Sequence, residues 1–515
     1  MAIFPQARYF NKKLALSCSL IALSSFNYGF DNQGFATTQA MDAFQRQFGV
    51  YDSSKEKYVI EPYWLSLFNS LNYIGFAAGV VIGSLISKAF GRRMCMFCMS
   101  GFALVTATIS VTSVKREQIM AARILNYLYV GMELSVIPAY QSEIVPASVR
   151  AFIVGTYQLS LLVGGLIVNS VCRGTSSLED NRAWRIPIGL FYIVPSIILS
   201  LIWFIPESPR WLALQGRNDE AKKSLRILRE GAFSEDEIEN QFAELQYALE
   251  MEQEKGAFIE IFQSFNLKRT LIVFVVNFFQ QATGQAFASQ YSTIYVKSLG
   301  TIDPFNFSLI LAAVNIVANT SCLLVADKLG RWYIDSRNLL LAGAAVQTAA
   351  LMVMGGLGTA DPVTDPLKIG IISMLALMTA GFSLGWAPLT YVVTTELPAL
   401  RLRDYTLRVG FVVNVVMNFA VNFSIPYLID AKYAGLDSKV GFIFGAIAVL
   451  AFLFTWFFVP ECKGKTLEQV DIMFNNGIAL RKFGSYKFPD LVTGDEKMAQ
   501  VLQKEPNVTL VENQV

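Results

Sequence analysis

Two side chains of opposite charge lie inside long apolar stretches of this chain. Asp31 falls in the stretch 14–36, and Arg123 falls near the start of the stretch 119–142. If these are the first and the fourth membrane spans, the two residues lie near the same face and can meet at similar depth. A carboxylate paired with arginine stays ionised and is released by protonation, which gives a two-state element that a proton can bias. The alternative is a static ion pair.

A further carboxylate, Glu133, lies ten residues beyond Arg123 in the same stretch. It could titrate, bind a polar group of a substrate or pair with another helix, and the sequence leaves these three roles open. The chain contains no histidine, which removes the usual proton shuttle near neutral pH. Any coupling to protons must therefore use carboxylates.

Amide side chains recur at helical spacing within other apolar stretches. Asn414, Asn418 and Asn422 fall at i, i+4 and i+8, so they form one stripe on a helix face. Amides both donate and accept hydrogen bonds, as the binding of a hydroxyl-rich solute requires. The pattern predicts a polar substrate cavity, and the alternative is hydrogen bonding that only holds helices together. Further polar residues of these stretches are Gln158, Gln280, Gln281, Gln285, Tyr291, Asn315, Asn319 and Tyr391.

The stretches that carry these residues are long enough to cross a membrane. The chain is 53% hydrophobic and only 16% charged, below the charge content that is usual in soluble domains. Irregular backbone cannot face lipid, so each span must be a helix, and the chain is predicted to be an all-α membrane protein. Twelve spans are predicted, at 14–36, 62–87, 94–114, 119–142, 151–172, 184–205, 269–296, 305–326, 337–358, 368–394, 405–430 and 440–459.

Three motifs recur after corresponding spans in the two halves of the chain. A long repeat of this kind in an apolar chain is typical of a membrane transporter built from two parallel halves. The motifs are Gly91-Arg92-Arg93, Glu143 with Arg150, and Pro206-Glu207-Ser208-Pro209-Arg210 in the first half, and Gly330-Arg331, Glu396 with Arg403, and Pro460-Glu461-Cys462-Lys463-Gly464-Lys465 in the second.

The charged residues of these motifs sit at the ends of spans on one side. They can form a salt-bridge network that holds an inner gate shut. The alternative is ordinary solvated surface charge, which contributes little, and the repetition in both halves argues against it. The predicted gate consists of Arg92, Arg93, Glu143, Arg150, Glu207, Arg210, Asp327, Arg331, Glu396, Arg403 and Glu461.

These features divide the chain into five segments. Residues 1–13 and 460–515 are tails, 14–205 and 269–459 are six-helix bundles, and 206–268 form a charged helical linker. An even number of spans puts both tails and the linker on one side of the membrane. We expect that side to be cytoplasmic.

Several function classes have no support in the sequence. Six cysteines are scattered without the spacing of a metal site, so no metal is expected. The phosphate-binding pattern Gly-x-x-x-x-Gly-Lys is missing, so ATP is not expected as the energy source. No pairing of nucleophile and base suggests an enzyme, and no cofactor is indicated. A net charge of +2 gives no reason to expect nucleic acid as a partner.

Together these motifs resemble those of the sugar porter family of the major facilitator superfamily. The amino-acid sequences of the loops resemble those of fungal members of that family. The resemblance covers roughly residues 14–475. It implies a monomer with two pseudo-symmetric six-helix bundles and a central site that opens alternately to either side. Proton-coupled members carry Asp and Arg where this chain has Asp31 and Arg123, whereas uniporters commonly replace that Asp. The sugar-contacting positions of the family correspond to Gln158, Gln280, Gln281, Asn315, Asn414 and Asn418.

The pocket departs from the usual pattern of the family. In the seventh span the usual Asn is Ala286, and one of two Tyr is Gln290. The tenth-span Trp that packs on hexoses is replaced by Tyr391, and the Trp beside the eleventh-span Asn is Val415. A plain glucose specificity is therefore in doubt. A disaccharide, a polyol or another polyhydroxylated compound would fit.

The sequence thus predicts a secondary active transporter that imports a sugar or related polyol by proton symport through alternating access. One alternative is a facilitative carrier or an exporter of another metabolite on the same fold, and another is a non-transporting sugar receptor. The expected partners are the solute, protons and the lipid bilayer, and the expected location is the plasma membrane. Asn306-Phe307-Ser308 forms a glycosylation sequon in the short loop before the eighth span.

Overall fold

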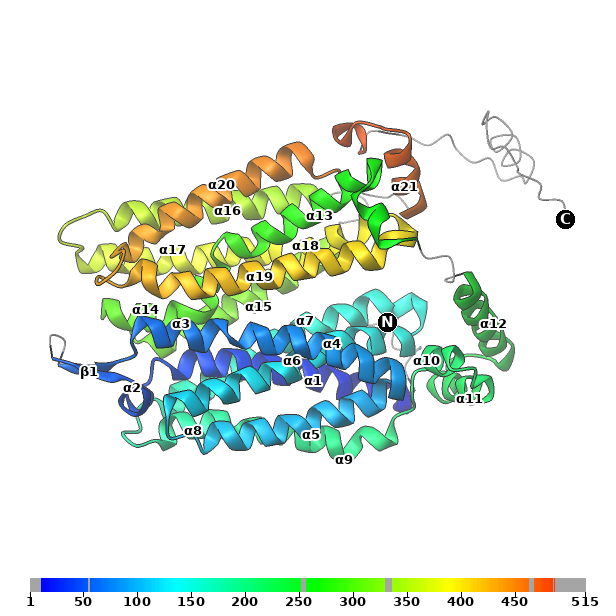
Figure 1. Cartoon of the computed structure of the whole chain (residues 1–515), viewed down its shortest axis with the longest axis horizontal. Coiled ribbons are helices and arrows are strands. Elements are labelled where there is room, and N and C mark those ends of the chain that lie inside the picture. Colours follow the sequence, from blue (N-terminus) through cyan, green and yellow to red (C-terminus); the bar gives the residue numbers. More distant parts are fainter. Residues whose placement is uncertain are drawn as a thin grey trace, which may run out of the picture.

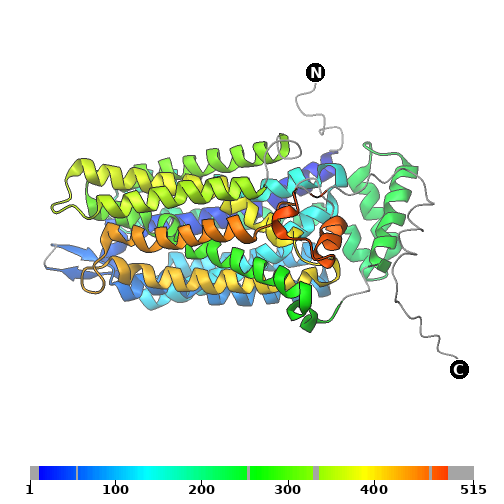
Figure 2. The same ribbon diagram turned by 90° about the horizontal axis from the view of Figure 1, so that it is seen from above.

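The computed structural model consists mainly of long helices that lie side by side in two groups, one from each half of the chain (Figure 1). A short β-hairpin lies at one end of the long axis, which we call the hairpin end. Three helices of the linker lie at the opposite end, the linker end, as Figure 2 also shows. The structure describes residues 11–53, 56–251, 256–328, 336–462, 467–484 and 486.

The first half begins at the linker end and returns there after its last long helix. Its hairpin is antiparallel, with Val50 opposite Val59. The linker that follows contains three helices, α10 (Pro209–Leu214), α11 (Asn218–Arg229) and α12 (Glu235–Met251). The elements of the first half are α1 (Lys12–Thr38), α2 (Asp42–Phe48), β1 (Val50–Asp52), β2 (Lys57–Val59), α3 (Pro62–Ser70), α4 (Asn72–Phe90), α5 (Arg92–Val111), α6 (Arg116–Ile144), α7 (Ala147–Thr175), α8 (Arg182–Gly189) and α9 (Ile193–Leu201), with 3-10 helices at Leu190–Tyr192 and Ile202–Phe204.

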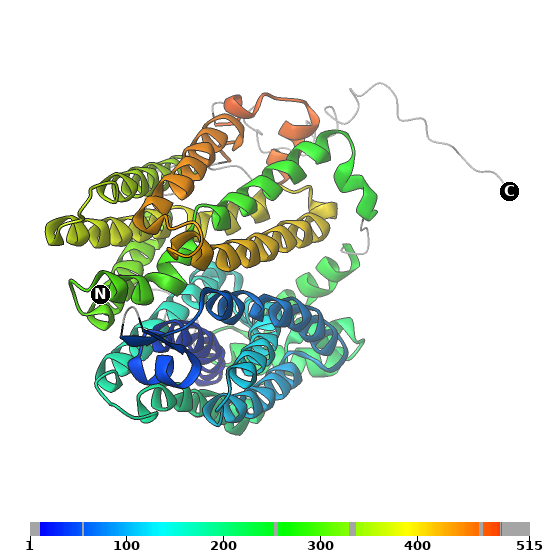
Figure 3. The same cartoon turned by 60° about the vertical axis from the view of Figure 1, so that its left-hand side comes forward.

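The second half repeats this arrangement, and Figure 3 shows the two groups from the side. Its seventh span is interrupted by a π-helix, Phe287–Tyr291, between two α-helices. Its helices are α13 (Ser264–Ala282), α14 (Ser292–Leu299), α15 (Pro304–Lys328), α16 (Ser336–Leu357), α17 (Asp365–Leu384), α18 (Trp386–Glu396), α19 (Arg403–Ile429), α20 (Val440–Phe458) and α21 (Leu467–Asn475), with 3-10 helices at Phe258–Phe262, Leu400–Leu402, Asp437–Lys439 and Leu480–Lys482.

Each predicted span corresponds to one long helix or to consecutive helices that continue one another. In the described part of the chain, nine of these segments are long and apolar enough to cross a membrane by composition. The three that do not meet that measure are α1, α6 and α7. In α1 and α6 the charged side chains Asp31, Arg123 and Glu133 lower the mean hydropathy. The fold is therefore the all-α membrane fold that the sequence predicts.

Glycines bring pairs of helices in the first half into backbone contact. A Cβ atom added at Gly75 of α4 would lie 1.9 Å from the Ile124 carbonyl oxygen of α6, and one at Gly79 would lie 2.1 Å from that of Leu128. A Cβ added at Gly29 of α1 would lie 1.8 Å from the carbonyl oxygen of α7 at residue 161. Small residues of this kind permit close packing of membrane helices. These contacts hold α6 against α4 and α1 against α7. The helices α1 and α6 carry the charged residues.

The two halves are joined at the hairpin end. There α7 packs on α15, and α3 packs on α19. Lys297 of α14 donates hydrogen bonds to the Ala40 carbonyl (2.6 Å), to Asp42 (2.6 Å) and to Gln45 (2.9 Å) of the first half. Ser66 of α3 donates to a carbonyl of α19 at 2.8 Å. These contacts close the hairpin end.

The space between the halves is open toward the linker end. Tyr391 of α18 is 44% exposed, although Tyr28 and Tyr157 of the first half lie within electrostatic range of it. A side chain that faces the opposite half and is nevertheless exposed borders a solvent-filled space. The halves are thus in contact at the hairpin end and separated toward the linker end.

The sequence suggested that the glycosylation sequon lies in a loop, but in the structure it lies in a helix. Asn306 lies in the first turn of α15, where it accepts a hydrogen bond from Arg173 Nε at 2.6 Å. Ser308, the third residue of the sequon, is buried and hydrogen-bonded to Thr293 at 2.7 Å. The helix begins at Pro304, one residue before the expected start of the eighth span, and Asp303 accepts hydrogen bonds from the backbone N–H groups of Phe305 and Asn306.

Candidate functional site

Asp31 and Arg123 form an ion pair between α1 and α6. Arg123 donates to Asp31 Oδ2 at 2.8 Å, and the side chains are only 4% (Arg123) and 13% (Asp31) exposed. The Arg123 guanidinium lies over the rings of Phe35 (4.0 Å) and Tyr127 (4.9 Å). Cation–π contacts of this kind stabilise a guanidinium that is removed from water. The structure therefore brings together the two charged residues that the sequence singled out.

The residue after Asp31 connects this pair to the second half. Asn32 Oδ1 accepts a hydrogen bond from the Tyr127 hydroxyl at 2.8 Å and another from Gln290 Nε2 at 2.9 Å. Gln290 belongs to the π-helix of the second half, and π-helical turns often occur at functional sites. Sequence reasoning missed Asn32. The available signal was its position beside Asp31, together with the unusual Gln at position 290.

Three of the predicted amides form a hydrogen-bonded cluster between α13 and α19. Asn414 donates to Gln280 Oε1 at 2.6 Å and accepts from Gln281 Nε2 at 3.1 Å. Gln280 Nε2 also donates to the Trp386 carbonyl at 3.4 Å. Tyr391 lies beside this cluster, with its hydroxyl near Gln280. We call Gln280, Gln281 and Asn414 the amide cluster.

The other predicted amides lie apart from this cluster. Asn315 accepts a hydrogen bond from Ser383 at 2.6 Å. Asn418 accepts a hydrogen bond at 2.6 Å from Asn422, which lies one turn further along α19. These two amides are therefore hydrogen-bonded to each other within one helix. Gln158 of α7 is half-buried, and in the described part of the chain it makes no hydrogen bond to the other predicted amides.

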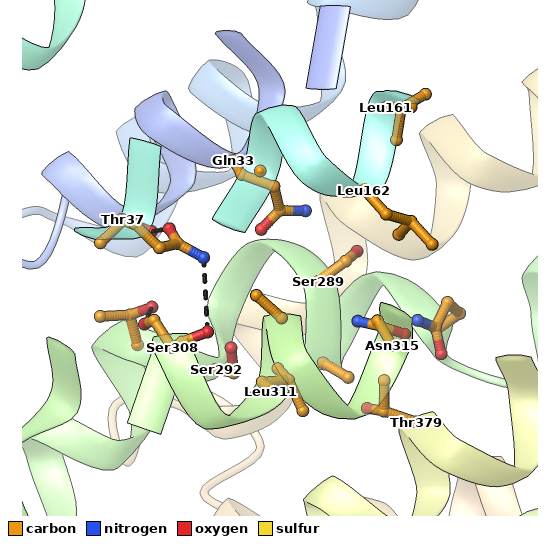
Figure 4. Close-up of a pocket in the computed structure, with 16 residues that line it drawn as sticks. Gln33, Thr37, Leu161, Leu162, Ser289, Ser292, Ser308, Leu311, Asn315 and Thr379 are labelled. Atoms are coloured by element: carbon orange, nitrogen blue, oxygen red, sulfur yellow. Dashed lines mark hydrogen bonds between the residues drawn. The ribbon is translucent and has the colours of Figure 1, made fainter. Parts of the chain in front are cut away.

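A cavity of about 40 Å³ lies between the halves, on the hairpin side of the amide cluster. Figure 4 shows Gln33, Ser289 and Asn315 around it, contributed by α1, the π-helix and α15. The first half adds Thr37 and Asn169, which are hydrogen-bonded to each other at 2.7 Å. Sequence reasoning missed Gln33, Thr37 and Asn169. Asn169 lies three helical turns after Gln158 and could have been found from that spacing.

Charged residues at the linker end connect α5, α6 and the segment before α10. Arg92 makes two hydrogen bonds to the Glu143 carboxylate, at 2.8 and 2.9 Å, and Ser208 donates to the same carboxylate at 2.5 Å. Glu207 accepts hydrogen bonds from the backbone N–H groups of Arg92 (3.0 Å) and Arg93 (3.1 Å). Burial raises the pKa of Glu207, and these backbone N–H groups partly oppose that shift. The contacts hold together the first half and the start of the linker.

The rest of the predicted gate is less completely described. Glu396 lies within electrostatic range of Arg403. Glu461 is buried beside Gly484, and Arg210 lies on α10. The Arg150 and Asp327 side chains and all of Arg331 lie outside the described residues.

Comparison with known proteins places the chain in a family. The family described as "Sugar (and other) transporter" matches residues 17–474. The hexose transporter HXT9 of Saccharomyces cerevisiae is 26% identical over 497 residues, which cover 94% of this chain and 86% of that protein. Hexose transporter 2 of Kluyveromyces lactis is 28% identical over 498 residues, with coverage of 94% and 86%.

Solved structures show the same fold. The inward open conformation of the xylose transporter XylE from E. coli aligns with a TM-score of 0.71 and 20% identity, over 89% of this chain and 99% of that one. The proton:xylose symporter XylE bound to 6-bromo-6-deoxy-D-glucose aligns with a TM-score of 0.69 and 21% identity, over 90% of this chain and 99% of that one. The chain therefore belongs to the sugar porter family of the major facilitator superfamily and is a membrane-embedded sugar transporter rather than an enzyme.

Proposed function

We propose that this transporter imports its sugar or polyol by proton symport, with Asp31 as the proton acceptor and Arg123 as its counter-charge. The observation that carries the proposal is the buried ion pair between α1 and α6. A buried charge without its partner costs several kcal/mol, so Arg123 strongly favours the ionised form of Asp31. Protonation neutralises Asp31 and loosens α1 from α6. A proton therefore biases the balance between two states of the molecule.

The hydrogen bonds of Asn32 supply a connection from this switch to the second half. Asn32 follows Asp31 on α1 and accepts from Gln290 across the boundary between the halves. A shift of α1 that follows protonation of Asp31 would therefore act on the π-helix. That segment also lines the cavity through Ser289. In this arrangement the proton and the solute act on the same contact between the halves.

The amide cluster and the cavity supply groups that suit a hydroxyl-rich solute. Amides donate and accept hydrogen bonds, and hydroxyl groups do both. A cavity of 40 Å³ holds only a few water molecules, so the site must widen before a sugar enters. The names of the relatives point to hexoses and pentoses as solutes. The substitutions at Ala286 and Gln290 favour a solute other than plain glucose.

The linker end would face the cytoplasm in the plasma membrane, with a monomer as the working unit. In that orientation the open space between the halves faces inward, so the structure is an inward-facing state. The charged cluster around Glu143 and Glu207 would then organise the cytoplasmic ends of α5 and α6. The assignment of both termini to the cytoplasm belongs to the same proposal.

The test is uptake of labelled hexoses, pentoses, disaccharides and polyols by the purified protein in liposomes, with and without an inward proton gradient. The expected result is concentrative uptake of one solute only when the gradient is present. Equal uptake with and without the gradient would contradict symport.

That outcome would favour the second candidate, a facilitative carrier in which the Asp31–Arg123 pair only ties α1 to α6. The Asp31–Arg123 pair is buried and hydrogen-bonded, as a purely structural tie between two helices would also be, which motivates this candidate.

A further inference from the structure

Glu133 is a carboxylate without a counter-charge in the interior of the first half. Its side chain is completely buried. Oε2 accepts a hydrogen bond from the Tyr157 hydroxyl of α7 at 3.0 Å, and Oε1 has no hydrogen-bond partner in the described part of the chain. No described lysine or arginine forms a salt bridge with it. An unpaired carboxylate removed from water is costly, so the neutral acid is the favoured form here.

A seam of polar side chains lies between Glu133 and Asp31, along the contact of α1 with α6. Asn27 donates to the Tyr129 hydroxyl at 3.2 Å. The Ser25 hydroxyl lies beside the Glu133 carboxyl. The atoms Ser24 Oγ, Ser25 Oγ, Asn27 Oδ1 and Glu133 Oε1 are all buried and all without a hydrogen-bond partner among the described residues. Four such atoms in one place are unusual, because buried polar atoms are normally paired.

The position of Glu133 suits a group that receives a proton from Asp31. Glu133 follows Arg123 by ten residues on α6, so it lies about 15 Å nearer the linker end. The hydrocarbon core of a membrane is about 30 Å thick, so this step covers about half of it. The titratable groups that face Glu133 or its surroundings are Tyr28 and Asp31 of α1, Tyr129 of α6, Tyr157 of α7 and, across the open space, Tyr391 of α18.

We propose that Glu133 is a second proton carrier, which takes the proton from Asp31 and passes it toward the linker end. This rests on the proposed symport. Asp31 gives up one proton through the hydroxyls of the seam and regains its pairing with Arg123, and Glu133 gains that proton. Glu133 then releases it past the Tyr157 hydroxyl to water between the halves. The structure corresponds to the middle of this sequence, with Asp31 ionised and paired and the proton on Glu133.

The other roles that the sequence left open fit the geometry less well. A ligand for the solute would have to reach the space between the halves, whereas Glu133 is completely buried and its carboxyl is capped by Tyr157. A partner that only joins helices would have both oxygens hydrogen-bonded, whereas one of them is unpaired. A carboxyl that binds and releases a proton needs a spare oxygen and a polar neighbourhood, and Glu133 has both.

One test uses no solute. The infrared spectrum of the full-length protein in liposomes at neutral pH should contain the carbonyl band of a protonated carboxylic acid. Glu133→Gln should remove that band. The matched control Glu61→Gln changes an exposed glutamate that pairs with Arg116 and should keep the band. A spectrum of Glu133→Gln that retains the whole band would overturn the assignment of the proton to Glu133.

The second test measures transport of labelled D-glucose and D-xylose. Glu133→Gln should slow proton-driven uptake about 100-fold, the size expected when a positioned proton-transfer group is lost. Exchange of the same sugar at equal pH on both sides should be unchanged, which also shows that the variant folds. Normal proton-driven uptake, or loss of exchange as well, would overturn the proposal. Wild-type uptake that ignores the proton gradient would instead contradict the proposed symport, and the infrared result would stand on its own.

Discussion

The two halves of this molecule carry different chemistry at comparable places. In the first half the site includes ionisable interior side chains, with Asp31 paired to Arg123 and Glu133 nearby. In the second half the predicted site residues are neutral, with Asn414 hydrogen-bonded to two glutamines. Charge in one half can respond to protons, while amides in the other can bind hydroxyl groups without a change of charge.

The largest effect is expected from removal of the charge in the first half. Asp31→Asn should abolish accumulation of the solute against a gradient, because the amide cannot take up or release the proton. Exchange of solute across the membrane should continue, since the amide cluster is intact. The measurement is the accumulation ratio in liposomes. Asp180→Asn, in an exposed pair with Arg182, is the matched control and should accumulate normally. Normal accumulation by the Asp31→Asn variant would contradict the proposal that Asp31 is the proton acceptor.

The corresponding change in the second half should affect affinity rather than coupling. Asn414→Ala removes hydrogen bonds worth about 1 kcal/mol each, so the Kd for the solute should rise about tenfold. Accumulation should still require the proton gradient. Asn422→Ala is the control, because its side chain bonds to Asn418 within α19 and should affect thermal stability but not affinity. An unchanged Kd in Asn414→Ala would mean that the amide cluster only holds α13 to α19.

Loss of the hydrogen bond between Gln290 and Asn32, which joins the two halves, should have a smaller effect on transport. Gln290→Leu removes one hydrogen bond between the halves, worth about 1 kcal/mol, and should shift the balance of states about fivefold toward an open hairpin end. The distance between spin labels at Tyr63 and Tyr433 reports that shift. Asn32→Ala should have a similar effect, and the double variant should add little to either. Full additivity would show that the two residues act separately.

The smallest effect concerns Glu207 at the linker end. Burial raises its pKa, so the folded protein binds this proton more tightly than the unfolded chain does. The contribution of Glu207 to stability therefore increases as pH falls through the raised pKa, and it levels off below the ordinary value of about 4.3. Glu207→Gln should remove that part of the pH dependence of Tm. Equal slopes for the two proteins would contradict it.

Much of the fold could be predicted because membrane helices are recognised in a sequence by their length and apolar composition. The pairing of Asp31 with Arg123 could be predicted as well, since the direction of alternate spans fixes which residues share a depth. The division of the chain at 205/206, 268/269 and 459/460 stays a prediction. The roles assigned to the site residues are also still predictions.

Contacts between the halves could not be predicted in the same way. The hydrogen bond from Gln290 to Asn32 depends on how the halves are tilted in this state and on a π-helix that no local pattern indicated. The stripe of α19 was expected to act as one surface. Instead Asn414 reaches glutamines of α13, whereas Asn418 is occupied by Asn422. The spacing of residues in the sequence shows which of them share a helix face. The helix packed opposite each turn decides which hydrogen bonds the side chains of that turn form.

The glycine contacts of α4 with α6 and of α1 with α7 have a consequence for how motion and chemistry are divided. Backbones that touch at Gly75, Gly79 and Gly29 cannot slide or rotate against each other without collision. These contacts tie α6 to α4 and α1 to α7, so the loosening proposed on protonation of Asp31 takes place between these two pairs of helices rather than within either pair. The proposed solute site, by contrast, is shared between the two halves, so its shape changes when the halves move. In the proposed mechanism the proton therefore needs only a small shift within the first half, whereas the solute needs a movement of one half against the other.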